Sequence, residues 1–229
     1  LEKIKKIFIE KDVVLLHGVT SSGKTEIYIQ LMEEAILGGK QVLYLLPEIA
    51  LTTQIIQRLS KRFGNHVYVY HSRFSQNEKV ETWNRISNGN NSTTIVLGAR
   101  SALFLPFSNL GLIIVDEEHE NSFKQFDRAP RYHARDAALM LAKIHGAKTL
   151  LGSATPSIET YFNSNNGKFG LVEMTERYGG VQLPEIIVNR NGDILNHFPQ
   201  VFVKFGSGVV FGSGGFSFCQ KLLKDIRRA

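Results

Sequence analysis

Short apolar runs alternate with helix-length amphipathic segments along most of the chain. Parallel strands with helices on both faces are buried on both sides, so their sequences are continuously apolar in this way. The pattern therefore predicts an α/β fold with a mostly parallel sheet and helices on both faces. The expected strands are Val13–His17, Val42–Leu46, Val67–Tyr70, Thr94–Leu97, Leu112–Asp116 and Thr149–Gly152.

The helices expected between these strands have apolar residues spaced three to four apart and recognisable ends. They are Lys24–Leu37, Leu51–Phe63, Glu78–Ile86 and Ala134–His145, followed by a short helix opened by Pro156 and Ser157. Gly38, Gly64 and Gly146 follow three of them, where glycine commonly ends a helix.

The end of the chain has a different character. From about Asn189, glycine, serine and phenylalanine crowd together with no clean period of two or of 3.6 residues. Two alternatives stay open for this stretch: a glycine-bearing hairpin followed by a final helix, or a poorly ordered end. We therefore divide the chain into a lobe of residues 1–188 and an atypical C-terminal tail of residues 189–229.

Composition narrows the class of protein. The 229 residues are 43% hydrophobic, enough for one good-sized core, and the net charge of +6 permits attraction to nucleic acid. A single cysteine, Cys219, excludes an internal disulfide and a cysteine-rich zinc cluster. No apolar run reaches the ~20 residues that span a bilayer, and the first residues lack the apolar stretch of a signal peptide. We expect a soluble cytoplasmic protein with no membrane partner.

The strongest chemical signal is GVTSSGKT, residues 18–25, which follows the first expected strand and precedes the first expected helix. Glycines let successive backbone N–H groups face one anion, and the helix start adds about half a positive charge there. Lys24 is then expected to reach the β- and γ-phosphates of ATP, and the Thr25 hydroxyl to ligate Mg²⁺. The residues expected to hold the nucleotide are Gly18, Thr20, Ser21, Ser22, Gly23, Lys24, Thr25 and Glu26. The alternative is a chance glycine turn with a capping threonine.

A second signal is LIIVDEEH, residues 112–119, where an apolar strand carries a carboxylate to the same sheet edge as the phosphate loop. Asp116 suits Mg²⁺, and Glu117 is positioned to polarise the water that attacks the γ-phosphate. We therefore expect Lys24, Asp116 and Glu117 to be catalytic, with Thr25 and Asp116 as metal ligands. The alternative is a charged strand end that faces solvent.

The segment GSATP, residues 152–156, also follows an expected strand and offers two hydroxyls, those of Ser153 and Thr155. A hydrogen bond from them to His119 or Glu117 would transmit γ-phosphate occupancy to other parts of the protein, as switch segments do. The alternative is a simple helix start with Thr or Ser as the N-cap. Both interpretations can hold together.

These segments, with PEIAL and GARSALFLPF, resemble in order and spacing motifs I, Ia, Ib, II and III of superfamily-2 DEXH helicases. More narrowly, HGVTSSGKTEIY, LLPEIALT, YHS, DEEHENSFKQ and RYHARDAA resemble the PriA family of primosomal replication-restart helicases. This resemblance covers about residues 13–187 and implies a RecA-like P-loop NTPase domain, the first motor lobe of a 3′-to-5′ DNA helicase. It implies ATP hydrolysis coupled to movement on single-stranded DNA, action at forked DNA, and replication-restart proteins as partners.

The resemblance also implies where DNA lies. Residues 120–131 (ENSFKQFDRAPR) correspond to an aromatic-rich loop that links DNA occupancy to ATP hydrolysis in that family. Rings that stack on bases and cations that meet phosphates are the composition of single-strand binders. The expected DNA contacts are Thr52, His71, Arg100, Ser101, Phe123, Lys124, Phe126 and Arg128. The alternatives are a surface loop with its phenylalanines packed into the core and, elsewhere, ordinary loops or helix caps.

Other parts of that helicase family have no counterpart in this sequence: an N-terminal DNA-binding region, a second motor lobe with an arginine finger, and a zinc module. We expect a first lobe without its second lobe, weakly active or inactive by itself, because hydrolysis in such motors occurs between two lobes. Two other classes stay open, a P-loop kinase or switch protein and a non-catalytic module that docks replisome proteins.

Overall fold

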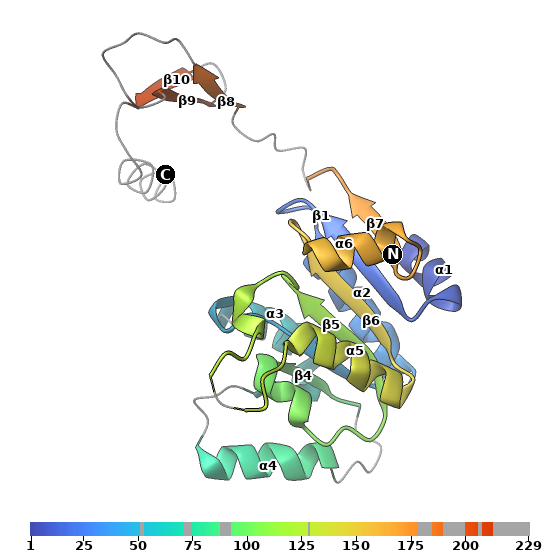
Figure 1. Ribbon diagram of the computed structural model, residues 1–229. Coiled ribbons are helices and arrows are strands. Elements are labelled where there is room, and N and C mark those ends of the chain that lie inside the picture. Colours follow the sequence, from blue (N-terminus) through green and yellow to red (C-terminus); the bar gives the residue numbers. More distant parts are fainter. Residues whose placement is uncertain are drawn as a thin grey trace. The chain divides into compact units, whose positions relative to one another are not determined.

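The computed structural model describes residues 1–50, 53–70, 75–87, 93–127, 129–177, 185–189, 200–205 and 208–212 (Figure 1). The chain divides into two compact units, Leu1–Gly179 and Gly180–Ala229. None of the described helices is long and apolar enough to cross a membrane.

The first unit is built on a seven-stranded sheet in which all neighbouring strands run parallel. Its strands are β1 (Val13–Gly18), β2 (Gln41–Leu45), β3 (Val67–Tyr70), β4 (Ile95–Gly98), β5 (Leu110–Asp116), β6 (Lys148–Ser153) and β7 (Gly170–Met174). Their order across the sheet is β3-β4-β2-β5-β6-β1-β7. β6 therefore lies between β1 and β5, and the carboxyl ends of these three strands share one edge of the sheet.

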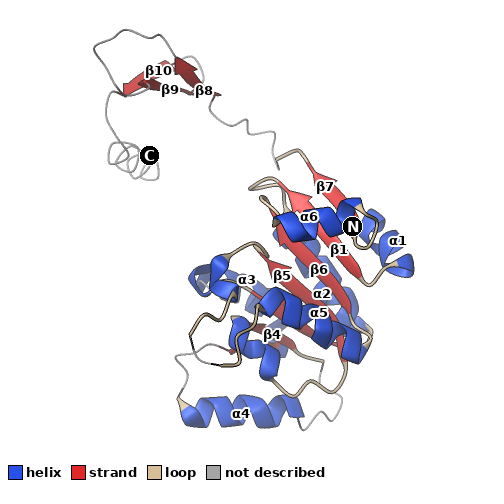
Figure 2. Ribbon diagram, viewed as in Figure 1, coloured by secondary structure: helices blue, strands red, loops and turns tan. Residues whose placement is uncertain are grey.

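Helices cover both faces of this sheet (Figure 2). They are α1 (Glu2–Glu10), α2 (Lys24–Leu37), α3 (Thr53–Phe63), α4 (Gln76–Ser87), α5 (Ala134–His145) and α6 (Ile158–Asn165), with 3-10 turns at Glu48–Ala50, Gly64–His66, Arg100–Phe104 and Asn121–Phe123. The predicted α/β fold with a parallel sheet is confirmed. Neither α1 nor β7 was predicted from the sequence, although Ile4, Ile7 and Phe8 of α1 have helical spacing.

Side chains along each strand alternate between two apolar clusters, one on each face of the sheet. In β2, Leu43 and Leu45 belong to the cluster that includes α5, whereas Val42 and Tyr44 belong to the cluster that includes α1, α2 and α3. These four side chains are buried. Burial on both faces explains why the strand sequences are continuously apolar.

Local signals set where two of the helices begin and end. α5 ends at Gly146, whose φ of 63° is in the left-handed region that glycine adopts without a Cβ penalty. α6 begins after Ser157, whose side chain accepts a hydrogen bond from Thr160 N. Ser157 is therefore the N-cap, which leaves the nearby Thr155 hydroxyl available for other contacts.

The second unit contains a three-stranded antiparallel sheet in the order β10-β9-β8. Its strands are β8 (Glu185–Asn189), β9 (Gln200–Phe205) and β10 (Gly208–Gly212). β8 thus belongs to the second unit, ahead of the boundary at residue 188 that composition suggested. The final helix considered from the sequence falls within residues 213–229, outside the described residues.

Truncation of a strand side chain should be far more costly than the same truncation on the surface. We expect Leu43→Ala, at a fully buried position, to lower the free energy of unfolding by about 2–5 kcal/mol. Leu37→Ala, at the exposed end of α2, is the matched control and should change it by less than about 0.5 kcal/mol. Denaturant titration followed by fluorescence of Trp83, the single tryptophan, measures both. Equal losses would contradict this assignment of the core.

Candidate active site

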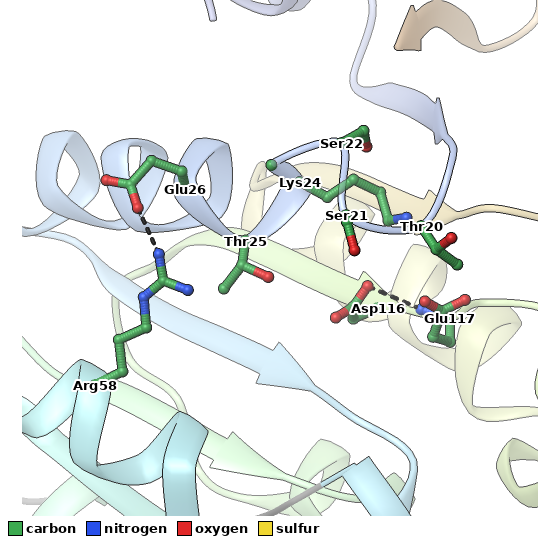
Figure 3. A pocket seen from close by; sticks show the side chains of 10 residues that line it. Thr20, Ser21, Ser22, Lys24, Thr25, Glu26, Arg58, Asp116 and Glu117 are labelled. Atoms are coloured by element: carbon green, nitrogen blue, oxygen red, sulfur yellow. Dashed lines mark hydrogen bonds and ion pairs between the residues drawn. The ribbon is translucent and has the colours of Figure 1, made fainter. Parts of the chain in front are cut away.

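A cleft of about 560 Å³ opens where the parallel strands end (Figure 3). It is lined by Thr20, Ser21, Ser22, Gly23, Lys24, Thr25, Glu26, Arg58, Asp116 and Glu117. Apart from Gly18, every residue expected to hold nucleotide lines this cleft. The loop after β1 and the acids at the end of β5, far apart in the sequence, therefore face one space.

The loop between β1 and α2 combines close packing with unusual backbone conformations. Ser21 and Gly23 have positive φ values, 61° and 90°. A Cβ on Gly18 would lie 2.7 Å from the Ser22 hydroxyl oxygen, so glycine permits the close approach. The buried Ser22 hydroxyl has no hydrogen-bond partner within the described part of the chain. This unpaired donor and the first N–H groups of α2, which lack intrahelical partners, fit an anion such as a phosphate.

Lys24 is folded back into this loop. Its Nζ donates to the carbonyl oxygens of Gly18, at 2.7 Å, and Val19, at 3.4 Å. The side chain is 9% exposed, so the ammonium group is largely withdrawn from water. Lys24 therefore brings a positive charge into the loop itself.

Two arginines that the sequence analysis did not single out add positive charge around the loop. Arg58, from α3, lines the cleft and pairs with Glu26 at 2.7 Å. Arg177 donates to the Thr20 hydroxyl at 2.9 Å. Arg58 is an exposed side chain and the hydrogen bond of the half-buried Arg177 is exposed, so these contacts contribute little to stability. Their relevance is the charge that the two arginines carry.

Asp116 receives three hydrogen bonds. Its Oδ1 accepts from the Tyr28 hydroxyl at 2.9 Å and from Glu117 N at 3.1 Å, and its Oδ2 accepts from the Tyr44 hydroxyl at 3.1 Å. Burial raises the pKa of Asp116 above its ordinary value, the adjacent Glu117 charge acts in the same direction, and the two tyrosine hydrogen bonds oppose both. Burial also raises the pKa values of Tyr28 and Tyr44, so both hydroxyls remain donors.

The oxygen groups in the cleft fit a magnesium ion. Thr25 supplies a hydroxyl and Asp116 a carboxylate to the same space, and Mg²⁺ takes oxygen ligands while keeping several waters. Glu117 lines the cleft beside them and is half-buried. A loop that fits a phosphate and oxygen groups that fit a metal ion thus line one cleft.

The turn after β5 brings the DEEH and GSATP segments into contact. Glu117 has a φ of 50°, a conformation that a non-glycine residue adopts only when its surroundings enforce it. His119 Nδ1 lies 2.8 Å from the Ser153 hydroxyl, and its Nε2 lies 3.2 Å from the Thr155 hydroxyl. The structure therefore brings together the three residues expected to couple the site to the rest of the protein.

Glu118, in the same turn, has a role that was not predicted from the sequence. Its carboxylate is completely buried. It accepts from Ser157 N at 2.7 Å, from the Thr160 hydroxyl at 2.9 Å and from Arg135 Nη1 at 3.0 Å. A buried carboxylate with several donors is a structural anchor, and this one ties the DEEH turn to the start of α6 and to α5.

The loop expected to contact DNA divides into a buried and an exposed part. Phe123 is 1% exposed and packs in the core, so the alternative considered from the sequence holds for this residue. Phe126 is 57% exposed, and the Lys124 Nζ lies 4.9 Å from the centre of its ring. Together with Gln125, Arg131, Tyr132 and His133, these two residues line a second cavity of about 410 Å³.

The other residues expected to contact DNA are arranged as follows. Arg100 donates to the carbonyl of Lys124 at 2.9 Å, so its guanidinium supports the aromatic loop. Ser101 is half-buried in the same 3-10 turn, Arg100–Phe104. Thr52, His71 and Arg128 lie outside the described residues.

The family model of the DEAD/DEAH box helicases matches residues 2–163, which include the phosphate loop, the DEEH turn and the GSATP segment. The chain belongs to the DEAD/DEAH box helicase family. Membership of this family implies ATP binding, in agreement with the shape and chemistry of the cleft.

Individual curated proteins resemble this chain more specifically than the family model does. The chain is 46% identical over 188 residues to the replication restart protein PriA of Bacillus subtilis and 50% identical over 187 residues to that of Haemophilus influenzae. Each match covers 82% of this chain and 23% or 24% of the relative. The chain therefore spans about a quarter of the length of these curated relatives.

Solved structures support the fold. A structure of RecG bound to a three-way DNA junction matches with a TM-score of 0.53 and 22% identity, covering 76% of this chain and 22% of that chain. A hypothetical ATP-dependent RNA helicase from Sulfolobus tokodaii matches with a TM-score of 0.51 and 20% identity, covering 74% and 50%. At these identities the likeness concerns the RecA-like fold.

Removal of the buried cation beside Glu118 should destabilise the fold strongly. We expect Arg135→Met to lower the free energy of unfolding by about 3–5 kcal/mol, because it leaves the Glu118 charge buried without its ionic partner. Arg62→Met removes an exposed arginine that pairs with Glu33 and should have a much smaller effect. Denaturant titration of both variants measures the difference, and equal effects would argue against an anchoring role for Glu118.

Proposed function

We propose that this chain is the ATP-binding motor lobe of a 3′-to-5′ DNA helicase that acts in the restart of replication forks. The observation that carries the proposal is that His119, which follows the acids of the cleft, contacts both hydroxyls of the GSATP segment. A protein that only transfers phosphate to a small acceptor has no need of such a link. The similarity to PriA proteins supports the narrower assignment to replication restart.

In this proposal the residues of the cleft divide the work on ATP. The amides of the loop and Lys24 hold the β- and γ-phosphates, while Thr25 and Asp116 ligate Mg²⁺, which neutralises charge on the phosphates when bound. Glu117 accepts a proton from the attacking water. Lys24 would leave the carbonyls of Gly18 and Val19 for phosphate oxygens, which are stronger acceptors because they are charged.

The contact of His119 with Ser153 and Thr155 is proposed as the route by which nucleotide occupancy is transmitted. Glu117 Oε2 lies 3.7 Å from His119 Nδ1, so a displacement of Glu117 on nucleotide binding alters the surroundings of this imidazole. The imidazole would in turn alter its two hydroxyl partners on the loop after β6. We propose that these contacts change between the nucleotide-free and nucleotide-bound states, as switch segments do.

Single-stranded DNA and forked DNA are the proposed nucleic-acid partners, and replication-restart proteins the proposed protein partners. Because Phe123 is buried, stacking on bases is assigned to Phe126. Phosphate contacts are assigned to Lys124, Arg128 and Arg131. The remaining contacts are assigned to Thr52, His71, Arg100 and Ser101. Contacts of this kind bind the backbone without discriminating sequence.

We propose that this lobe alone hydrolyses ATP slowly and does not unwind DNA. Hydrolysis in motors of this type occurs between two RecA-like lobes, and an arginine supplied from outside the phosphate loop is worth about 10³–10⁵ in rate. Residues 1–179 form a single such lobe.

Loss of the loop lysine should abolish nucleotide binding. We expect Lys24→Ala to raise the Kd for a Mg²⁺-bound, non-hydrolysable ATP analogue beyond the measurable range of calorimetry, because the only lysine that lines the cleft in the described chain is removed. Lys40→Ala is the matched control, because it removes an exposed lysine that is hydrogen-bonded to Asn109. This variant should bind the analogue with the same Kd as the unchanged chain.

A Glu117→Gln variant separates binding from turnover. It should retain nucleotide affinity, since it keeps the shape of the side chain, while lowering the rate of ATP hydrolysis.

Unchanged affinity in Lys24→Ala would remove the phosphate loop from the proposal. Transfer of phosphate to a small acceptor would favour a kinase instead.

The exposed ring of the aromatic loop should carry a measurable share of DNA binding. We expect Phe126→Ala to weaken binding of a labelled single-stranded oligonucleotide by about 1–3 kcal/mol, the typical contribution of one base stacked on an aromatic ring. Phe162→Ala removes a similarly exposed ring from α6, 62% against 57% exposed, and should leave the affinity unchanged. Fluorescence anisotropy at fixed salt measures both, and equal affinities in the two variants would exclude Phe126 from the DNA interface.

A further inference from the structure

We propose that Tyr28 and Tyr44 are positioning residues for the carboxylate of Asp116, and that the missing side chain of Gly152 is what lets Tyr28 reach it. The inference rests on the proposed function, since it assumes that Asp116 ligates the Mg²⁺ that accompanies bound nucleotide. It gives a role to Tyr28, Tyr44 and Gly152, three residues that have no part in the proposed hydrolysis of ATP described above.

The first observation is that both oxygens of Asp116 are held by tyrosine hydroxyls. Tyr28 donates to Oδ1 at 2.9 Å and Tyr44 donates to Oδ2 at 3.1 Å. Rotation of the carboxylate about its terminal bond would break both hydrogen bonds together. The two hydroxyls therefore fix the plane of the group as well as its position.

The second observation is that the tyrosines themselves have little freedom. Their side chains are 0% and 1% exposed, and their ring centres lie 5.8 Å apart at an interplanar angle of 64°. A buried hydroxyl without a hydrogen bond destabilises the folded state. Asp116 accepts a hydrogen bond from each of these two hydroxyls. Packing thus holds the donors in place, and the donors hold the acid.

The two donors come from elements on either side of the site. Tyr28 lies on α2, four residues after Lys24, so the two share one face of the helix. Tyr44 lies on β2, where it is in register with Ile114 of the strand that ends at Asp116. The hydroxyls therefore link α2, the helix that follows the phosphate loop, and β2, the strand beside β5, to one carboxylate.

The third observation is the close approach at Gly152. A Cβ at this position would lie 1.8 Å from the Tyr28 hydroxyl oxygen and 2.9 Å from the ring carbon that bears it. Gly152 is in register with Asp116 on one side and with Leu16 on the other. Any side chain at residue 152 would therefore displace the Tyr28 hydroxyl from Asp116, which gives the glycine of the GSATP segment a specific task.

Orientation of this acid matters for the metal more than for the nucleotide. Mg²⁺ demands near-octahedral geometry at short distances, so a carboxylate that turns freely is a poorer ligand. Groups that orient a metal ligand without touching the metal typically contribute about 10–100-fold to metal affinity. Asp116 contacts no phosphate in the proposed arrangement, so nucleotide binding without metal should not depend on the tyrosines.

The test compares affinity for a fluorescent, non-hydrolysable ATP analogue in excess Mg²⁺ with affinity for the same analogue in EDTA. We expect Tyr28→Phe and Tyr44→Phe each to reduce the ratio of these affinities about tenfold, while the affinity in EDTA stays unchanged. Tyr68→Phe is the matched control, because it removes a hydroxyl from β3 that interacts with Arg85 away from the cleft. Thermal melts of all three variants report whether each one folds.

A double-mutant cycle tests the task given to Gly152. Gly152→Ala should reduce the Mg²⁺ ratio as Tyr28→Phe does, and most of that reduction should be absent when the Tyr28 hydroxyl has already been removed. Additive effects would show that Gly152 acts independently of Tyr28 and would overturn this part of the inference.

The outcomes separate this inference from the proposed function. If the unchanged chain binds the analogue with a strong Mg²⁺ dependence and both tyrosine variants keep it, the positioning role is wrong and the function stands. Equal losses with and without Mg²⁺ would indicate a general structural role and would also overturn it. If the unchanged chain binds no analogue under either condition, the proposed function fails.

Discussion

Parallel pairing of β1, β6 and β5 is the constraint on which the rest of the site depends. Because β6 lies between the other two strands, the GSATP segment emerges between the phosphate loop and the acids. The strand registers bring the ends of these three strands close together. Gly152 lies opposite both Leu16 and Asp116, and Ser153 lies opposite His17. A one-residue slip of β6 would turn Leu151 to the other face of the sheet and carry the hydroxyl of Ser153 away from His119.

At this edge of the sheet, the two acids on either side of Glu117 have different roles. Asp116 faces the cleft and is held by hydroxyls, so it keeps access to a ligand. Glu118 faces inward and is tied by Arg135 and the start of α6, so it holds the turn in place. Glu117, between them, has a backbone conformation that it would not adopt alone, and the anchoring of its neighbours explains how that conformation persists.

In the first unit, local chemistry in the sequence was enough to predict six of the seven parallel strands, five of the six α-helices and every lining residue of the cleft except Arg58. It was not enough where the outcome depends on packing between distant segments. Tyr44 within QVLYL has the pattern of a core residue, and only the three-dimensional structure shows its hydroxyl meeting Asp116. A third acid in DEEH suggests a solvated charge, whereas Glu118 is buried. Phe123 and Phe126 are three residues apart in one loop, and nothing in the sequence says which of them enters the core.

The position of Lys24 lowers the conformational entropy that the cleft loses when it binds a phosphate. A free lysine side chain carries about 2 kcal/mol of rotamer entropy, which is lost when the side chain is fixed on a ligand. Here the carbonyls of Gly18 and Val19 have already fixed it. That loss therefore belongs to folding rather than to binding, and an arriving phosphate needs only to exchange one set of oxygen partners for another. The loop is preorganised by its own backbone.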